Sequence, residues 1–245
     1  AVPELKEIAE VKGEQIASVD SNDISVAILL QLAQKLHQDL AGDTAAAVIT
    51  HGTDTLEETA FFLSLTTKTD KPIVLVGAMR PATAISADGS MNLLQAASVA
   101  VHEDAAKRGV MMVNDRIGSG FYITKTRANT PDAFKSVEAG YLGLMIGLEP
   151  HFYYLPQQPS NRPYFDVSGY KELPRVDIIY GYQSTDTALL DAAIENGAKA
   201  VVIDATGAGS LSTPLLERVK ELTAQAARWK AISACLKTKA SAAAF

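Results

Sequence analysis

Signals for helices and strands alternate along most of this chain, which limits the folds that it can adopt. Residues 26–40 place leucines at helical spacing, whereas residues 46–50 form a short, apolar and β-branched run. Strands that alternate with helices are typical of βαβ units around a parallel sheet. We therefore predict an α/β fold with helices at 26–40, 56–65, 91–101, 185–196 and 214–222, and strands at 46–50, 72–76, 109–113, 176–180 and 200–204.

One segment interrupts the alternation. Residues 150–174 hold five of the ten prolines and four of the eight tyrosines, and they show little periodicity. We predict that this part is an extended linker between two α/β domains. The expected organisation is an N-terminal domain at 1–150, a linker at 151–175 and a C-terminal domain at 176–245.

The composition excludes several classes of function. Acidic residues outnumber basic ones, 28 to 22, so the net charge is −6, and this balance argues against partners such as nucleic acid or an anionic membrane. Cys235 is the only cysteine, which excludes an intrachain disulfide and a cysteine-rich zinc site. No apolar run approaches the roughly 18 residues that a membrane span needs. We expect no metal, no cofactor, and neither a nucleic-acid nor a membrane partner.

Polar clusters follow three of the predicted strands, where ligands bind in open α/β sheets. The clusters are residues 51–55, 79–89 and 206–210. In the first, the order Thr55-Leu56-Glu57-Glu58 fits a capping box in which Thr55 caps the helix and Glu58 reaches back. Thr53 lies outside that cap, and its hydroxyl can face the crevice. His51 is expected to be structural, while Thr53 and Asp54 are either catalytic or local stabilisers.

Two further features have competing interpretations. Lys125 stands among residues of strand type, where it is either a surface lysine or a partner of Asp54 in proton transfer. Gly207 and Gly209 form a Gly-x-Gly pair, but Ser212 occupies the third glycine position of the dinucleotide fingerprint. The pair therefore indicates a tight turn or a small-ligand contact, and a dinucleotide module is the remotest alternative.

Several ordered motifs resemble one family. Residues 49–63, Ile-Thr-His-Gly-Thr-Asp-Thr-Leu-Glu-Glu-Thr-Ala-Phe-Phe-Leu, are similar to the signature of bacterial L-asparaginases and glutaminase-asparaginases. The resemblance extends through residues 70–81, 86–89, 114–117, 124–126 and 173–178. Gly13-Glu14-Gln15 followed by Ser21 fits the secreted, type II branch best.

The resemblance implies a fold and an activity. The fold is a larger N-terminal, Rossmann-like parallel-sheet domain and a smaller C-terminal, flavodoxin-like domain, assembled as a homotetramer that is a dimer of dimers. The activity is hydrolysis of the side-chain amide of L-asparagine, with L-glutamine as a second small-molecule substrate, to the acid and ammonia. No cofactor or metal is implied, and the branch implies a periplasmic or secreted location.

Site residues follow from the same resemblance. Thr53, Asp54 and Lys125 are similar to a catalytic set that transfers protons and orients the attacking water. Expected substrate contacts are Ser21, Asn22, Gly52, the carbonyl of Ala78, and Ser210, the last lent by a partner subunit. Asn22 stands where the family has Gln or Glu.

The family's opening strand, which ends in Ala-Thr-Gly-Gly-Thr-Ile-Ala, is not found among these residues. Its first threonine is the nucleophile that the resemblance implies for a threonine acyl-enzyme. We expect the sequence to be incomplete, because losing this strand would leave unpaired sheet edges. One alternative is a non-catalytic, amino-acid-binding relic; another is a related amidotransferase subunit that acts with transfer RNA.

Overall fold

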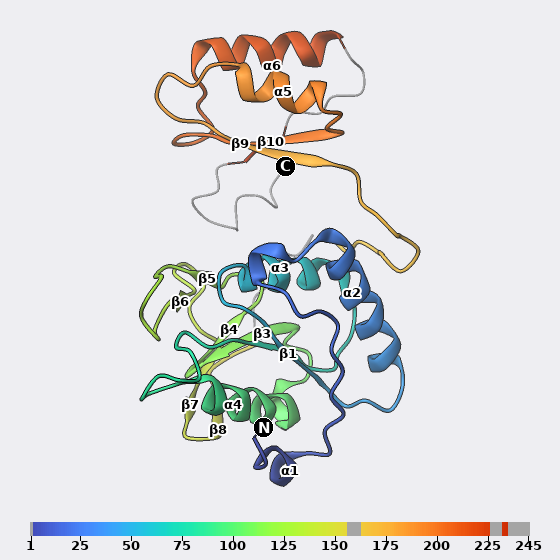
Figure 1. Cartoon of the computed structure of the whole chain (residues 1–245), viewed down its shortest axis with the longest axis vertical. Coiled ribbons are helices and arrows are strands. Elements are labelled where there is room, and N and C mark those ends of the chain that lie inside the picture. Colours follow the sequence, from blue (N-terminus) through green and yellow to red (C-terminus); the bar gives the residue numbers. More distant parts are fainter. Residues whose placement is uncertain (1, 156–162, 226–231, 235–245) are drawn as a thin grey trace. The chain divides into compact units, whose positions relative to one another are not determined.

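The chain divides into two compact units, Ala1–Lys171 and Glu172–Phe245. The computed structural model describes residues 2–155, 163–225 and 232–234 (Figure 1). The division falls within the predicted linker, but residues just before it belong to the first unit. Phe165 N–H donates to the Leu65 carbonyl at 2.9 Å, and Gln34 Nε2 donates to the Val167 carbonyl at 3.3 Å. The predicted domain bounds at 150 and 176 stay a prediction.

The first unit holds most of the helices and strands. Its helices include α2, which begins after Ser25, whose hydroxyl accepts from Ile28 N–H at 3.4 Å. The helical elements are α1 (Leu5–Ile8), η1 (Ser21–Asp23), α2 (Val26–Ala41), α3 (Leu56–Thr66), α4 (Gly89–Val101) and η2 (Glu103–Ala105). The strands are β1 (Ala47–Thr50), β2 (Ile73–Val76), β3 (Val110–Asn114), β4 (Arg116–Ser119), β5 (Thr124–Lys125), β6 (Phe134–Lys135), β7 (Gly143–Ile146) and β8 (Glu149–Phe152).

Six of these strands form one mixed sheet in the order β1-β2-β3-β4-β7-β8. β1, β2 and β3 are parallel, with Ala47 opposite Ile73 and Ile73 opposite Val110. The pairs β3–β4, β4–β7 and β7–β8 are antiparallel. β5 and β6 form a separate two-stranded antiparallel ribbon. The parallel half matches the sequence prediction, whereas the antiparallel half and the ribbon were not predicted.

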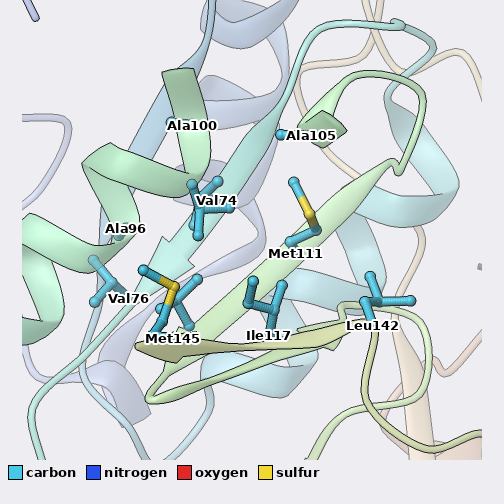
Figure 2. Packing of buried hydrophobic residues seen from close by; sticks show 11 residues of the cluster. Val74, Val76, Ala96, Ala100, Ala105, Met111, Ile117, Leu142 and Met145 are labelled. Carbon is cyan, nitrogen blue, oxygen red and sulfur yellow. The ribbon is translucent and has the colours of Figure 1, made fainter. Parts of the chain in front are cut away.

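Helices lie on both faces of the six-stranded sheet. In Figure 1, α2 and α3 lie on one face and α4 on the other. α4 packs against β1, β2, β3 and β8. Figure 2 shows this contact, in which Val74, Met111, Ile117 and neighbouring side chains meet Ala96 and Ala100 of α4. Small residues on α4 let the helix approach the sheet closely. Each large apolar side chain buried there stabilises the unit by about 1.5–3 kcal/mol.

The second unit is a smaller α/β layer. Its strands, β9 (Val176–Tyr180), β10 (Ala200–Asp204) and β11 (Ile232–Ala234), form a parallel sheet in the order β11-β10-β9. Two helices, α5 (Ala188–Glu195) and α6 (Thr213–Gln225), lie on one face of it in Figure 1. A core that includes Ile179, Ile203 and Leu215 holds the layers together.

The helices and strands predicted from the alternation are all present, with ends that shift by a few residues. The two-domain α/β fold class is therefore confirmed. The strands that the sequence did not reveal are β11, which has three residues, and β4 to β8, which have four or fewer and no helix between them. Short antiparallel strands carry little periodic signal, which is why they escaped a search for alternating helices and strands.

Candidate active site

The polar clusters after β1 and β2 lie at one edge of the sheet. The two strands are parallel, so they end side by side, and His51 N–H continues their pairing by donating to the Val76 carbonyl at 2.9 Å. A Cβ on Gly77 would lie 2.8 Å from Thr53 Cγ2 and 2.7 Å from the His51 carbonyl oxygen. The close approach of the two loops therefore requires glycine at position 77 and fixes where Thr53 sits.

Thr53, Asp54 and Lys125 meet at this edge. Lys125 Nζ donates to Thr53 Oγ1 at 3.0 Å and contacts Asp54 Oδ1 at 2.5 Å. The lysine side chain is only 12% exposed, whereas the Asp54 side chain is 59% exposed. The ammonium is thus held between a hydroxyl and a carboxylate that faces solvent. The structure places together the three residues predicted to be catalytic; their catalytic role stays a prediction.

The electrostatics of the site favour an ionised aspartate. The hydrogen bond from Lys125, and then its positive charge, lower the pKa of Asp54 from its ordinary value of 3.8. Burial opposes this shift, and the Asn22 side chain makes the weakest contribution to lowering the pKa. Asp54 therefore stays a carboxylate at neutral pH, and it can accept a hydrogen bond from an ammonium or stabilise one.

Lys125 reaches the site from the β5–β6 ribbon, and a carboxylate from α3 contacts that ribbon. Glu57 lies in the first turn of α3. Its Oε1 accepts from Thr124 Oγ1 at 2.6 Å, and its Oε2 accepts from the backbone N–H of Lys125. Sequence reasoning assigned no role to Glu57, because glutamates in a first helical turn are usual whatever they contact.

Ser21, Asn22 and Gly52 also lie at the site. Ser21 is buried, and a Cβ on Gly52 would lie 2.8 Å from Ser21 Cβ and 2.9 Å from Ser21 Oγ. Asn22 is held by Asp20, which accepts from its backbone N–H at 3.0 Å and from its side chain at 2.9 Å. These residues line one side of the Thr53–Asp54 turn. Their predicted contacts with a substrate stay predictions.

The predicted capping box at α3 is wrong. Thr55 is the N-cap residue, but its side chain makes no capping hydrogen bond. Instead, Thr55 Oγ1 donates to the Ser21 carbonyl at 2.7 Å. In a capping box this hydroxyl would accept from the N–H of residue 58, but here it donates to a distant carbonyl. The hydroxyl therefore joins two segments that both contribute site residues.

His51 has the structural role that we expected. Nδ1 lies 2.6 Å from the Gly52 carbonyl oxygen, to which only a ring N–H can donate, so Nε2 accepts from Thr59 Oγ1 at 2.8 Å. Burial lowers the pKa of His51 from 6.5, although the Gly52 carbonyl and the Glu58 charge oppose that shift. Both ring nitrogens are hydrogen-bonded within the protein, so His51 helps to orient the loop, and its lack of a catalytic role stays a prediction.

Ala78 lies in the neighbouring loop, which a carboxylate holds in place. Met79 and Arg80 N–H groups donate to Asp88 at 3.0 and 2.9 Å. Asn92 Nδ2 donates to the Gly77 carbonyl and to Asp88, both at 2.9 Å. The backbone is therefore fixed on both sides of Ala78, whose carbonyl is the predicted substrate contact. Sequence reasoning included Asp88 in a polar cluster but did not find the role of Asn92 in holding this loop.

Ser210 belongs to the second unit. Thr206 and Ser210 form a bridge across a tight turn that contains Gly207 and Gly209 at φ +58° and +100°. The Gly-x-Gly pair thus makes a turn, as predicted, because both glycines need left-handed backbone. Ser210 is exposed at the end of this turn. Its predicted contact with a substrate is not tested by this geometry.

Across residues 2–155, 163–225 and 232–234, the structure contains no group of three or more His, Cys, Asp or Glu side chains that could hold a metal ion. Within the same residues, no helix is both long enough and apolar enough to cross a membrane.

Comparison with known proteins shows the family. The asparaginase N-terminal family model matches residues 1–158, and the glutaminase/asparaginase C-terminal domain model matches residues 175–243. Together these matches cover most of the chain, so it belongs to the asparaginase family, as the sequence motifs indicated.

Individual relatives agree with this assignment. A probable L-asparaginase 1 from Schizosaccharomyces pombe is 50% identical over 87% of this chain and 60% of its own length. A glutaminase-asparaginase from Pseudomonas fluorescens biotype A is 43% identical over 91% of this chain and 62% of its own length. The crystal structure of a probable cytoplasmic L-asparaginase from Campylobacter jejuni superposes with a TM-score of 0.87 at 42% identity, covering 91% of this chain and 72% of that one.

The chain spans about 60% of the length of the curated relatives that it matches. The solved relative is described as cytoplasmic, so the comparisons do not support the periplasmic or secreted location that the sequence motifs implied.

Proposed function

We propose that the whole protein hydrolyses the side-chain amide of L-asparagine, and also that of L-glutamine, to the acid and ammonia. The contact of Lys125 Nζ with both Thr53 Oγ1 and Asp54 Oδ1 supports this proposal most directly. A hydroxyl, an ammonium and a carboxylate in sequence can pass a proton during attack on an amide and departure of ammonia. Membership of the asparaginase family, and relatives named for asparagine and glutamine, support the substrate class.

We infer two covalent stages. In the first, a threonine hydroxyl attacks the amide carbon and forms an ester. The C–N bond breaks, and the hydroxyl proton is transferred to the nitrogen, which leaves as ammonia. In the second, water attacks the acyl-enzyme ester and releases the acid. The resemblance assigns the nucleophile to the threonine of the family's opening strand, and it assigns proton transfer and the orientation of water to Thr53, Asp54 and Lys125.

Substrate recognition would use the opposite charges of an amino acid. The exposed carboxylate of Asp54 suits the α-ammonium, and the Ser21 hydroxyl with the Gly52 backbone suits the α-carboxylate. Asn22, whose side chain helps to lower the pKa of Asp54, would orient that carboxylate, and the Ala78 carbonyl would accept from the substrate amide. L-glutamine adds one methylene, which a pocket distinguishes by about 1–3 kcal/mol.

The test is release of ammonia from L-asparagine and L-glutamine by the whole protein, with Thr53→Val and Lys125→Met as probes. Activity that survives both substitutions would contradict the assigned roles. Binding of L-aspartate without any ammonia release by the unaltered protein would favour the amino-acid-binding relic instead.

We also propose the homotetrameric assembly, in which Ser210 of one subunit would contact substrate held by another. Its exposed position in a tight, hydrogen-bonded turn supports a role in such a contact. Light scattering gives the subunit number, and Ser210→Ala should raise the KM in the assembled protein. A monomer with full activity would exclude this part of the proposal.

A further inference from the structure

We propose that Glu57 is the positioning residue that holds Lys125 at the active site, by binding the β5–β6 ribbon to the first turn of α3. This inference rests on the proposed function for its kinetic consequence, although the contact itself does not. Glu57 would act through the backbone of Lys125, because its hydrogen bonds go to Thr124 and to the Lys125 N–H.

The ribbon that carries Lys125 is short. β5 and β6 are two residues each, with Lys125 opposite Phe134 and Thr124 opposite Lys135. An isolated two-stranded ribbon is marginally stable at best. The residues that follow β5, from 126 to 130, are exposed. The ribbon's own pairing is therefore a weak means of fixing the lysine backbone.

Glu57 contacts the side of β5 that β6 leaves free. Thr126 N–H donates across the ribbon to the Ala133 carbonyl at 2.8 Å. Backbone groups alternate in direction along an antiparallel strand, so the N–H of Lys125, one residue earlier, faces away from β6. That N–H donates to Glu57 Oε2. The Glu57 carboxylate thus accepts the backbone hydrogen bond that the carbonyl of a third strand would otherwise accept.

The second oxygen of Glu57 makes the contact bidentate. Oε1 accepts from Thr124 Oγ1 at 2.6 Å, so one carboxylate binds two successive residues of β5. Two such bonds fix orientation as well as distance. The lysine backbone is consequently tied to the same helix that begins just after Thr53 and Asp54, the two groups that Lys125 Nζ contacts.

The position of Glu57 in the sequence explains why this arrangement works. Asp54 and Glu57 are three residues apart and flank the start of α3, where the helix N-terminus favours negative charge. One carboxylate holds the backbone of Lys125 and the other meets its ammonium. A lysine side chain has four rotatable bonds, so fixing its backbone limits where Nζ can travel.

The experiment compares Glu57→Ala, Glu57→Gln and Thr124→Val with Glu58→Ala in the whole protein. Glu58 is the matched control, because it is the next glutamate in the same helical turn and is exposed. Two quantities are measured: kcat and KM for L-asparagine, and the rate at which an amine-reactive reagent labels Lys125, followed by peptide mass spectrometry. The labelling rate does not depend on turnover.

Glu57→Ala should lower kcat by about 100-fold, the scale of a misplacement near 1 Å, with a smaller change in KM. Labelling of Lys125 should become faster, because its side chain is 12% exposed when held. Glu57→Gln keeps an oxygen for the Lys125 N–H and should restore most of kcat and the slow labelling. Thr124→Val removes one of the two hydrogen bonds, so its kcat and labelling rate should lie between those of Glu57→Ala and Glu57→Gln. Glu58→Ala should match the unaltered protein in both quantities.

Unchanged kcat and labelling in Glu57→Ala would overturn the inference, as would equal losses in Glu58→Ala. A loss of kcat without faster labelling would also overturn it, since Lys125 would then be in place. If Glu57→Ala does not fold, Glu57→Gln and Thr124→Val decide by the same two measurements. If the unaltered protein releases no ammonia, the proposed function fails, and the labelling order alone still tests the role of Glu57.

Discussion

Asp54 and Asp88 occupy equivalent places in two neighbouring βα units but are held in different ways. Each lies beyond a parallel strand and next to the start of the following helix, Asp54 before α3 and Asp88 before α4. The pKa of each is lowered from its ordinary value. Asp54 owes this mainly to the hydrogen bond and charge of Lys125. For Asp88, burial opposes ionisation, and hydrogen bonds from the Met79, Arg80 and Asp88 N–H groups and from Asn92 together outweigh it.

The difference separates a chemical carboxylate from a structural one. Asp54 is mostly exposed and has a single cation as its main partner, so its charge can serve a substrate or a proton transfer. Asp88 uses its oxygens on Met79, Arg80 and Asn92, which leaves little capacity for a ligand. A lowered pKa therefore marks a functional group here only when its cause is a group that can take part in the reaction.

The largest expected effect comes from removing the cation beside Asp54. Lys125→Met should lower kcat by about 100- to 10,000-fold, the usual contribution of acid–base groups, as measured by ammonia release. Lys135→Met is the matched control, because Lys135 lies in the same ribbon but pairs with Asp132. Equal losses in both variants would show that the ribbon's charge matters rather than the Asp54 contact.

Exchanging each carboxylate for its amide should separate activity from stability. Asp88→Asn loses acceptors for backbone N–H groups and should lower the free energy of unfolding by about 1–2 kcal/mol, as followed by denaturant titration. Asp54→Asn removes an exposed ion pair, so it should lower the unfolding midpoint less than Asp88→Asn does while abolishing most ammonia release. The reverse pattern, with an unstable Asp54→Asn, would contradict the distinction between the two residues.

The packing between the two loops gives a third test. Gly77→Ala would place a Cβ 2.7 Å from the His51 carbonyl oxygen, so the β1 loop must move. Overpacking of this kind costs about 1–3 kcal/mol of stability. We expect lower kcat as well, because Thr53 Cγ2 is the next atom in contact. Gly13→Ala, where a Cβ meets nothing within 4 Å, is the control and should change neither quantity.

The pH dependence should differ between the two carboxylates. Asp54 has a folded pKa below its unfolded value, so it contributes stability above that unfolded value and loses it as the pH falls through the folded pKa. Lys125→Met removes the main cause of the shift, and the acid limb of the kcat profile should move to higher pH. Asp88→Asn should leave the acid limb of the kcat profile unchanged. If the limb shifts in both variants, the distinction between a reactive Asp54 and a structural Asp88 is wrong.

The smallest effect concerns His51, which lies just before the Thr53–Asp54 turn. Burial lowers its pKa below 6.5, so the unfolded chain takes up a proton first as the pH falls. The stability contributed by neutral His51 is therefore present above that value and is lost toward acid pH. His51→Gln should flatten the decline in unfolding midpoint over this range, and an unchanged slope would contradict our interpretation.

The sequence predicted the parallel framework well because that framework is local and periodic. The helices and strands of the βαβ units follow from repeated spacing, and polar residues after β1 and β2 follow from where parallel strands end. The catalytic candidates Thr53 and Asp54 lay in such a cluster. Their pairing with Lys125 was open from the residues alone, since 71 positions separate Asp54 from it.

Contacts between distant segments were beyond such reasoning. Thr55 looked like a capping residue because residues 55–58 have the sequence pattern of a capping box, yet its hydroxyl donates to the Ser21 carbonyl. Glu57 looked like an ordinary first-turn acid, yet it binds Thr124 and Lys125. In each case the same side chain suits a local and a tertiary partner equally, and only the fold decides which is near.

The contact between Gly52 and Ser21 limits how these two positions can vary in evolution. A Cβ at position 52 would lie 2.8 Å from Ser21 Cβ, so any larger residue there demands a smaller one at 21. The two positions should therefore change together, with glycine kept wherever serine is kept, although 31 residues of sequence separate them. A Gly52→Ala change is accordingly expected to be tolerated only in a background that also carries Ser21→Gly.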